Sequence, residues 1–242
     1  GGEVCCACLC VGRRLRVRFR QYVEFMDAWC RWVAADQVLN QIGKARPMFG
    51  GSVKGPFVLR SKVAMGTGYG SQHSMDPAGV FATAPGWRIV APSTPFDYVG
   101  LMNSALLCED PVVVLEHVDL YTSNGPGPVS DWDYCLPVGR ACIRRTGEDV
   151  TVLTYLAMTG YPLEAVERLG SVDAEVIDLR WLDRASVDWD TIEASVRKTN
   201  RVLIAEQGAR GTSYGAWLAD EVQRRLFDWL DHPVERVTGG EA

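Results

Sequence analysis

One short stretch of the chain combines a permissive backbone with a titratable side chain. Residues 66–77 read GTGYGSQHSMDP and place Gly66, Gly68 and Gly70 shortly before His73. Histidine exchanges protons near neutral pH because of its unperturbed pKa, and glycine lets the backbone come close to a ligand. The stretch follows an apolar run, where α/β sheets place their ligand sites. We therefore expect either the wall of an active site or a merely structural, solvated histidine.

The glycines do not make a recognisable nucleotide site. The dinucleotide fingerprint G-x-G-x-x-G fails at Ser71, no helix is expected to follow directly, and the Gly-Lys-Ser/Thr of a P-loop is missing. The other histidines, His117 at the end of an apolar run and His232 before a proline, are expected to be structural and exposed, respectively. No G-x-S-x-G nucleophile motif occurs. The residue types alone leave the reaction open.

Composition excludes several classes of protein. The chain has 242 residues, 47% of them hydrophobic and 23% charged, with a net charge of −5. No apolar run approaches the roughly 20 residues of a membrane span, and the acidic balance argues against a nucleic-acid surface. Four of the eight cysteines fall in CCACLC at residues 5–10 and the others are scattered. This spacing favours neither a disulfide framework nor a zinc site.

Apolar runs of strand character alternate with helical patterns along the whole chain. Strands are expected in RVRFRQYVEF, PFVLR, WRIVA and DPVVVLEH of the first half, and in DVTVLTY, AEVIDL, RVLIAEQ and VERVTG of the second. A helix is expected over residues 35–49, and another follows Ser93 or Thr94 as its N-cap. The Gly- and Pro-rich residues 119–137 read as a linker. The alternation predicts two three-layer α/β domains with mainly parallel sheets, over 1–125 and 126–242.

Several motifs in this order resemble one family. DQVLNQIGKARPMFGG, GSQHS, PGWRIVAPSTPFDYVGLMNSAL, DPVVVLEH and TIEASVRKTNRVLIAEQG are similar to the β subunit of thiamine-diphosphate-dependent 2-oxo acid dehydrogenases, which act on pyruvate, branched-chain 2-oxo acids or acetoin. The resemblance implies a transketolase-like pyrimidine-binding domain over 1–125 and a transketolase C-terminal-type domain over 126–242. It also implies that the chain is truncated at both ends.

The resemblance implies a function with partners. A β subunit of this family acts with an α subunit or domain, a second β chain and a lipoyl acyltransferase core, decarboxylates a small 2-oxo acid and passes the acyl group to lipoamide. The coenzyme, thiamine diphosphate, is shared, and the α partner holds its diphosphate and Mg²⁺. The chain accordingly lacks a GDG motif followed by asparagine. The expected location is the cytoplasm, or the mitochondrial matrix of a eukaryote.

The resemblance also assigns site residues. Glu3, at the start of a small-residue helix ending at Gly12, corresponds to the glutamate that contacts a ring nitrogen of the aminopyrimidine, so that its amino group can act as a base. Met26 and Cys30 correspond to the lining of the pyrimidine pocket, and His73 to the histidine that faces the coenzyme and the lipoyl arm. A structural K⁺ site, built mostly of backbone carbonyls, maps to Phe57, Ala105, Leu106, Cys108 and Asp110.

Two alternatives to this function stay open from the sequence. The unusual stretches CCACLC and DAWCRWV suit a non-catalytic subunit that keeps only the fold and the partner interface. A transketolase-type enzyme acting on a sugar phosphate would need a further domain in the same chain, and the QHS motif argues against it.

Overall fold

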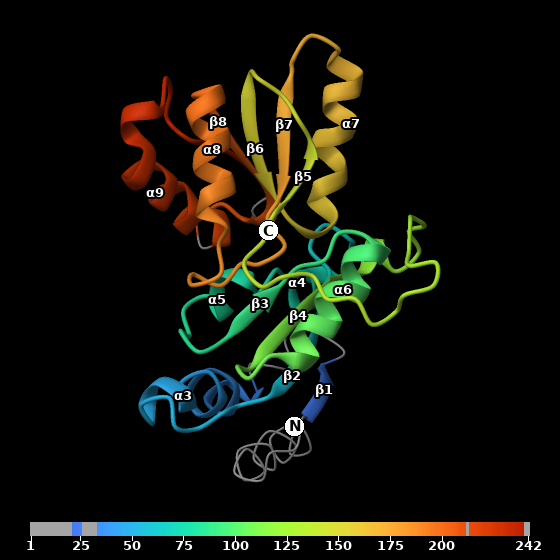
Figure 1. Cartoon of the computed structure of the whole chain (residues 1–242), viewed down its shortest axis with the longest axis vertical. Helices are drawn as coiled ribbons and strands as arrows, with labels where there is room; N and C mark the ends of the chain where they lie inside the picture. Colours follow the sequence, from blue (N-terminus) through green and yellow to red (C-terminus); the bar gives the residue numbers. More distant parts are fainter. Residues whose placement is uncertain (1–20, 26–32, 212, 240–242) are drawn as a thin grey trace.

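The structure is a computed structural model, and it describes residues 21–25, 33–211 and 213–239. Two sheets, each covered by helices on both faces, follow one another along the longest axis of the molecule (Figure 1). Over these residues the order of strands and helices expected from the sequence is confirmed, with the differences described below, whereas the helix expected to end at Gly12 lies outside them.

The first sheet is entirely parallel. It contains β1 (Gln21–Phe25), β2 (Phe57–Val63), β3 (Arg88–Val90) and β4 (Val112–His117) in the order β1-β2-β4-β3. Helix α6 (Pro95–Leu107) packs on one face through Leu101 and Ala105, whereas Val38, Ile42 and Phe81 cover the other. Thr94 caps α6, because its Oγ1 accepts a hydrogen bond from the Asp97 backbone N–H at 3.1 Å.

The helix expected over residues 35–49 is broken in two. A π-helix, η2 (Asp36–Ile42), is followed by a turn at Gly43 and by the short α3 (Ala45–Met48). The buried Trp87 accounts for the break: its indole N–H donates to the Val38 carbonyl at 2.9 Å, and its ring occupies the space that a Cβ on Gly43 would need. The apolar positions Val38, Ile42 and Ala45 are buried as the helical spacing requires.

The second sheet is parallel except at one edge. Its strands are β5 (Cys142–Arg145), β6 (Val150–Thr154), β7 (Ala174–Asp178), β8 (Val202–Ala209) and β9 (Glu235–Gly239), in the order β5-β7-β6-β8-β9. Strand β5 runs antiparallel to β7 and was not expected from the sequence. Helix α7 (Gly160–Leu169) covers one face, and α8 (Trp189–Thr199) and α9 (Tyr214–Leu226) cover the other. Short segments complete the list: α4 (Gly70–His73), α5 (Ala78–Phe81), η3 (Val118–Leu120), η4 (Leu156–Thr159) and η5 (Phe227–Trp229).

The two domains are joined by backbone pairing as well as by side chains. Val90 of β3 forms an isolated antiparallel bridge with Trp181, the Ala91 N–H donates to the Arg180 carbonyl at 2.8 Å, and the Leu182 N–H donates to the Ile89 carbonyl at 2.9 Å. One apolar cluster contains residues of both sheets, among them Ile89 and Leu153. The domains therefore share a core.

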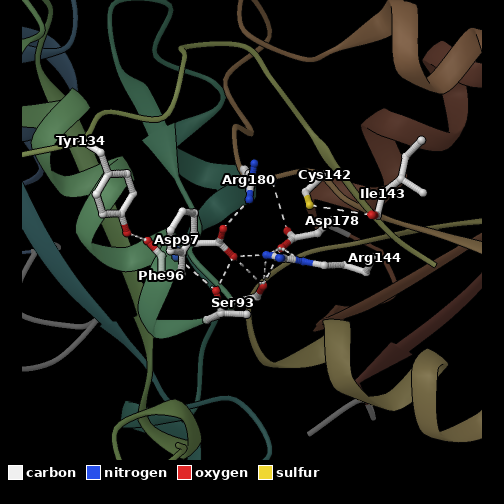
Figure 2. A network of polar contacts seen from close by, with 10 residues as sticks. Ser93, Phe96, Asp97, Tyr134, Cys142, Ile143, Arg144, Asp178 and Arg180 are labelled. Atoms are coloured by element: carbon white, nitrogen blue, oxygen red, sulfur yellow. Dashed lines mark hydrogen bonds and ion pairs between the residues drawn. The ribbon is translucent and has the colours of Figure 1, made fainter. Parts of the chain in front are cut away.

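A buried ionic network crosses the same boundary (Figure 2). Arg144 contacts Asp97 of α6 and, at 2.7 Å, Asp178 of β7, while Arg180 contacts the other oxygen of Asp97. Both aspartate side chains are 0% exposed. The hydroxyl of Ser93 lies between Arg144 and Asp178. Two guanidinium groups thus face two carboxylates, and each buried charge has a partner of opposite sign.

Candidate active site

The glycine-rich residues 66–73, called the His73 turn below, form an open turn at the carboxyl edge of the first sheet. Gly66, Gly68 and Gly70 have φ values of +80°, +79° and +79°, which L side chains rarely adopt. Nothing lies within 4 Å of the position that a Cβ would take at any of them. The conformation, rather than crowding, requires glycine here, and the edge is open to a ligand.

His73 ends the single helical turn α4, which corrects the expectation that no helix follows the glycines. The Ser74 N–H donates to the Gly70 carbonyl at 3.0 Å, and the Met75 N–H donates to the His73 carbonyl at 3.1 Å. The histidine is half-buried. Its turn follows β2 directly, and β1 pairs with β2 in parallel, with Phe25 opposite Ser61. The carboxyl ends of β1 and β2 therefore lie side by side next to the turn.

A cavity of about 640 Å³ lies between this turn and the carboxyl-terminal domain. Ser71 and Ser74 line it from the turn, and Glu206 and Gln207 line it from β8. His73 is not among the described residues that line it.

The other two histidines behave as expected. His117 is 3% exposed, its Nε2 lies 3.1 Å from the Met65 carbonyl, and its Nδ1 accepts the Asp119 N–H at 3.3 Å. These contacts fix the end of β4 to the start of the glycine turn. His232 is exposed.

Three of the predicted site residues are not described by the structure. Glu3, Met26 and Cys30 lie outside the described residues, so their assigned roles stay predictions. Met26 and Cys30 nevertheless belong to the segment that directly follows β1.

The residues predicted to bind an alkali cation gather at the opposite edge of the first sheet. Phe57 begins β2, while Ala105 and Leu106 lie in the last turn of α6, and Cys108 and Asp110 lie in the segment between α6 and β4. The Gly55 N–H donates to the Glu109 carbonyl at 2.9 Å and ties the two segments together. The Asp110 carboxylate contacts Arg46 and, at 3.0 Å, Arg88. A cation at this place would bind backbone carbonyl oxygens, because the Asp110 carboxylate already pairs with Arg46 and Arg88.

A polar cluster on β2 and β4 was not found by sequence reasoning. Arg60 donates to both oxygens of Glu116, at 2.6 and 2.8 Å, and the hydroxyls of Tyr98 and Tyr121 donate to the same carboxylate at 2.6 and 3.1 Å. Burial, and then the neighbouring Glu116 carboxylate, raise the pKa of both tyrosines. A cavity of about 420 Å³ adjoins the cluster. The signal available in the sequence was the position of Arg60 within a strand of mostly buried residues.

The implied coenzyme would have space at this edge of the first sheet, because Gly66, Gly68 and Gly70 border the cavity of about 640 Å³. Among residues 21–25, 33–211 and 213–239, no group of three or more His, Cys, Asp or Glu side chains is placed to hold a metal ion. None of the helices described by the structure is long and apolar enough to cross a membrane.

Comparison with known families divides the chain as the two sheets do. The family model "Transketolase, pyrimidine binding domain" matches residues 4–123, and "Transketolase, C-terminal domain" matches residues 139–242. A solved structure described as a split gene transketolase, inactive beta4 tetramer, has a TM-score of 0.78 at 19% identity, covering 99% of this chain and 73% of that one. At this identity the likeness shows the fold.

Curated relatives give the more specific comparison. The chain is 39% identical over 229 residues to pyruvate dehydrogenase E1 component subunit beta-1, mitochondrial, of Oryza sativa subsp. japonica, covering 92% of this chain and 60% of the relative. It is 35% identical over 218 residues to the acetoin:2,6-dichlorophenolindophenol oxidoreductase subunit beta of Cupriavidus necator, covering 89% and 62%. The chain thus spans about 60% of the length of these relatives. From its two matched domains and these relatives, the chain belongs to the family of transketolase-like β subunits of 2-oxo acid dehydrogenases.

Proposed function

We propose that the chain is the β-type component of a 2-oxo acid dehydrogenase. Acting with an α subunit or domain, it takes part in the oxidative decarboxylation of pyruvate or a branched-chain 2-oxo acid and in transfer of the acyl group to lipoamide. The observation that carries the proposal is the His73 turn, which lies open at the carboxyl ends of parallel strands in a chain of this family.

The coenzyme is thiamine diphosphate, which supplies a carbanion-stabilising ring when bound. This chain would hold the aminopyrimidine end through Glu3, Met26 and Cys30, with the Glu3 carboxylate against a ring nitrogen. The α partner would hold the diphosphate and its Mg²⁺. A structural K⁺ would bind the carbonyls contributed by Phe57, Ala105, Leu106, Cys108 and Asp110.

His73 is the proton-handling group of the described site. A positioned imidazole can act as a general acid and as a general base, so His73 can give and accept a proton during acyl transfer. The glycine turn places His73 at the carboxyl edge of the first sheet. The proposal therefore places the turn at the mouth of the site.

The assembly follows from the same family. We propose an α subunit, a second β chain and a lipoyl acyltransferase core as partners, in the cytoplasm or in the mitochondrial matrix. The proposed boundary between the pyrimidine-binding and C-terminal domains, at 125/126, falls in the irregular segment between β4 and β5. It agrees with the gap between the two matched family models.

Substitution of His73 tests the proposal. With an α subunit, thiamine diphosphate and Mg²⁺ present, His73→Ala is expected to slow acyl transfer to lipoamide about 10²- to 10⁴-fold, because a positioned acid–base group is lost. Decarboxylation measured with an artificial electron acceptor, which bypasses the lipoyl arm, is expected to fall far less. The exposed His232→Ala is the matched control, and both of its rates should equal those of the wild type.

Two outcomes would count against the proposal. A wild-type complex that assembles with the α subunit but decarboxylates no 2-oxo acid would mean that the chain is the non-catalytic subunit. Equal losses of both rates in His73→Ala would contradict the assignment of His73 to acyl transfer.

A further inference from the structure

Asp76, three residues after His73, ties the turn to the carboxyl-terminal domain. Its Oδ2 lies 2.8 Å from the Tyr155 hydroxyl at the end of β6 and 3.3 Å from the Gln207 amide nitrogen on β8. Its Oδ1 accepts the Ala78 N–H at 2.9 Å and so opens α5. Although Asp76 keeps some accessible surface, Tyr155 and Gln207 are buried. A single carboxyl group thus connects the His73 turn, α5 and two strands of the second sheet.

A second carboxyl group lies on the far side of the Tyr155 hydroxyl. Glu206 is 0% exposed, and its Oε2 is 3.4 Å from the tyrosine oxygen. Glu206 has its own donors and its own cation: it accepts from Ser213 Oγ at 2.6 Å and from the Gly215 N–H at 2.8 Å, and it pairs with Arg236 at 2.7 Å. Arg236 thus compensates the charge of Glu206.

The single proton of the Tyr155 hydroxyl indicates whether the Asp76 carboxyl group is protonated. A hydroxyl has one proton to donate, yet the Tyr155 oxygen contacts one oxygen of each carboxyl group. If both contacts are hydrogen bonds, one carboxyl group must carry a proton of its own. Glu206 is fully occupied by donors and paired with a cation, so the proton belongs on Asp76.

Charge balance points the same way. Within the part of the chain that the structure describes, the groups that face the Asp76 carboxyl are Tyr155 just after β6 and Gln207 and Glu206 from β8, with Arg236 of β9 and Tyr214 of α9 behind them. In this set Arg236 is the single cation for two acidic groups. A second buried carboxylate would lack a partner, which favours the neutral acid. Burial raises the pKa of Asp76, and the charge of Glu206 raises it further. Hydrogen bonds to the ionised carboxylate from Ala78, Tyr155 and Gln207 act in the opposite direction.

We propose that Asp76 is a positioning residue that, as a neutral carboxylic acid, donates a hydrogen bond to Tyr155 and holds the His73 turn against the carboxyl-terminal domain. When Asp76 ionises, Tyr155 must turn its proton to it, the contact with Glu206 is lost, and two carboxylates face each other across one hydroxyl. The turn then loosens. The effect on catalysis rests on the proposed function. The protonation of Asp76 and its role as the anchor, meaning the attachment of the His73 turn to the carboxyl-terminal domain, do not.

Infrared spectroscopy of the chain alone tests the proton directly. At neutral pH the wild type is expected to show the carbonyl band of a protonated carboxyl group, and Asp76→Asn is expected to lack it. The band should persist in Asp228→Asn, a control in which an exposed aspartate of η5 is changed. Absence of the band in the wild type, or its persistence in Asp76→Asn, would overturn the proposal.

Hydrogen exchange of residues 70–78 tests the anchor. After correction for intrinsic rates, wild-type exchange should accelerate as the pH is raised through the titration of the band, whereas Asp76→Asn should stay protected because asparagine mimics the neutral acid. Tyr155→Phe removes the bridging hydroxyl and should expose the turn at every pH. A turn whose protection is unchanged in Tyr155→Phe would contradict the anchor.

The stability of the chain should change with pH in a defined direction. Because the pKa of Asp76 is raised in the folded state, the folded chain binds this proton more tightly than the unfolded chain does. The stabilisation of the fold by this bound proton is therefore complete below the unfolded pKa of about 3.9. It is lost as the pH rises through the folded pKa. Asp76→Asn lacks this contribution, so the free energy of unfolding of the wild type minus that of the variant should fall with rising pH. A difference that rises would oppose the proposal.

The assembled enzyme supplies the functional readout. Asp76→Ala should slow acyl transfer about 10- to 100-fold, as expected for a small displacement of a catalytic group, with a smaller change in KM. Asp76→Asn should keep most of the rate and lose the alkaline limb of the pH profile. An unchanged alkaline limb in Asp76→Asn would refute the positioning role. If the wild-type complex has no activity, the proposed function fails, while the infrared and exchange results still decide the anchor.

Discussion

Replacing Arg144 by methionine is expected to lower the free energy of unfolding by about 3–5 kcal/mol, the range for removal of one partner from a buried ion pair. Arg144 supplies the contacts with both Asp97 and Asp178, whose side chains are 0% exposed. Without it, the contacts of Asp178 with other described residues are a hydroxyl and a backbone N–H, from Ser93 and Arg180. A buried carboxylate would then lack a cation. Chemical denaturation followed by tryptophan fluorescence measures the change.

The nearby Arg140→Met is the matched control for Arg144. The Arg140 side chain is 61% exposed, and its nearest carboxylate oxygen, on Asp188, is 3.8 Å away. Its loss should cost less than about 1 kcal/mol, as for other exposed ion pairs. If the two variants were equally stable, the network in Figure 2 would not hold the domains together as described.

Adding one methyl group at Gly147 is expected to destabilise the chain by about 3 kcal/mol, at the upper end of the usual cost of overpacking. A Cβ there would lie 2.5 Å from the carbonyl oxygens of Asp173 and Ala174, which are backbone atoms at the start of β7. The turn that contains Gly147 is itself fixed, because the N–H groups of Glu148 and Asp149 both donate to the Asp173 carbonyl. Neither side can move without breaking these hydrogen bonds.

Gly160→Ala in the same domain is the control for Gly147→Ala. Gly160 has φ −69° and ψ −38°, and nothing lies within 4 Å of its Cβ position. In such a helical conformation alanine stabilises a protein by about 0.4–1 kcal/mol. Thermal unfolding should therefore shift in opposite directions for the two variants. A mild effect at Gly147 would mean that β7 and its preceding turn are less closely packed than described.

The architecture could be predicted because its signals are local. Strands such as β4 and β7 are buried on both faces and read as short apolar runs, and the amphipathic helices between them show a helical period. Strand β5 was missed because its residues, CIRR, are mostly partly exposed and carry two arginines. It becomes a strand through pairing with β7, which no local pattern reveals.

The site could be predicted only where a titratable side chain and the glycines that shape its backbone are adjacent in the sequence. The residues of the His73 turn are adjacent in sequence, so their types indicated a site. The cationic partners of Asp97, Arg144 and Arg180, are 47 and 83 residues away, and sequence spacing carries no information about them. For the same reason Asp76 was not singled out, because its partner Tyr155 is 79 residues further along.

Binding of the coenzyme tests the central claim most directly. Thiamine diphosphate with Mg²⁺ should be titrated calorimetrically into the chain alone, into a cognate α subunit alone and into their mixture. The account predicts strong, saturable binding in the mixture and none of comparable strength in either chain alone, because each chain holds one end of the coenzyme. Binding in the mixture that is no tighter than binding to the α subunit alone would contradict the claim that this chain contributes half of the site.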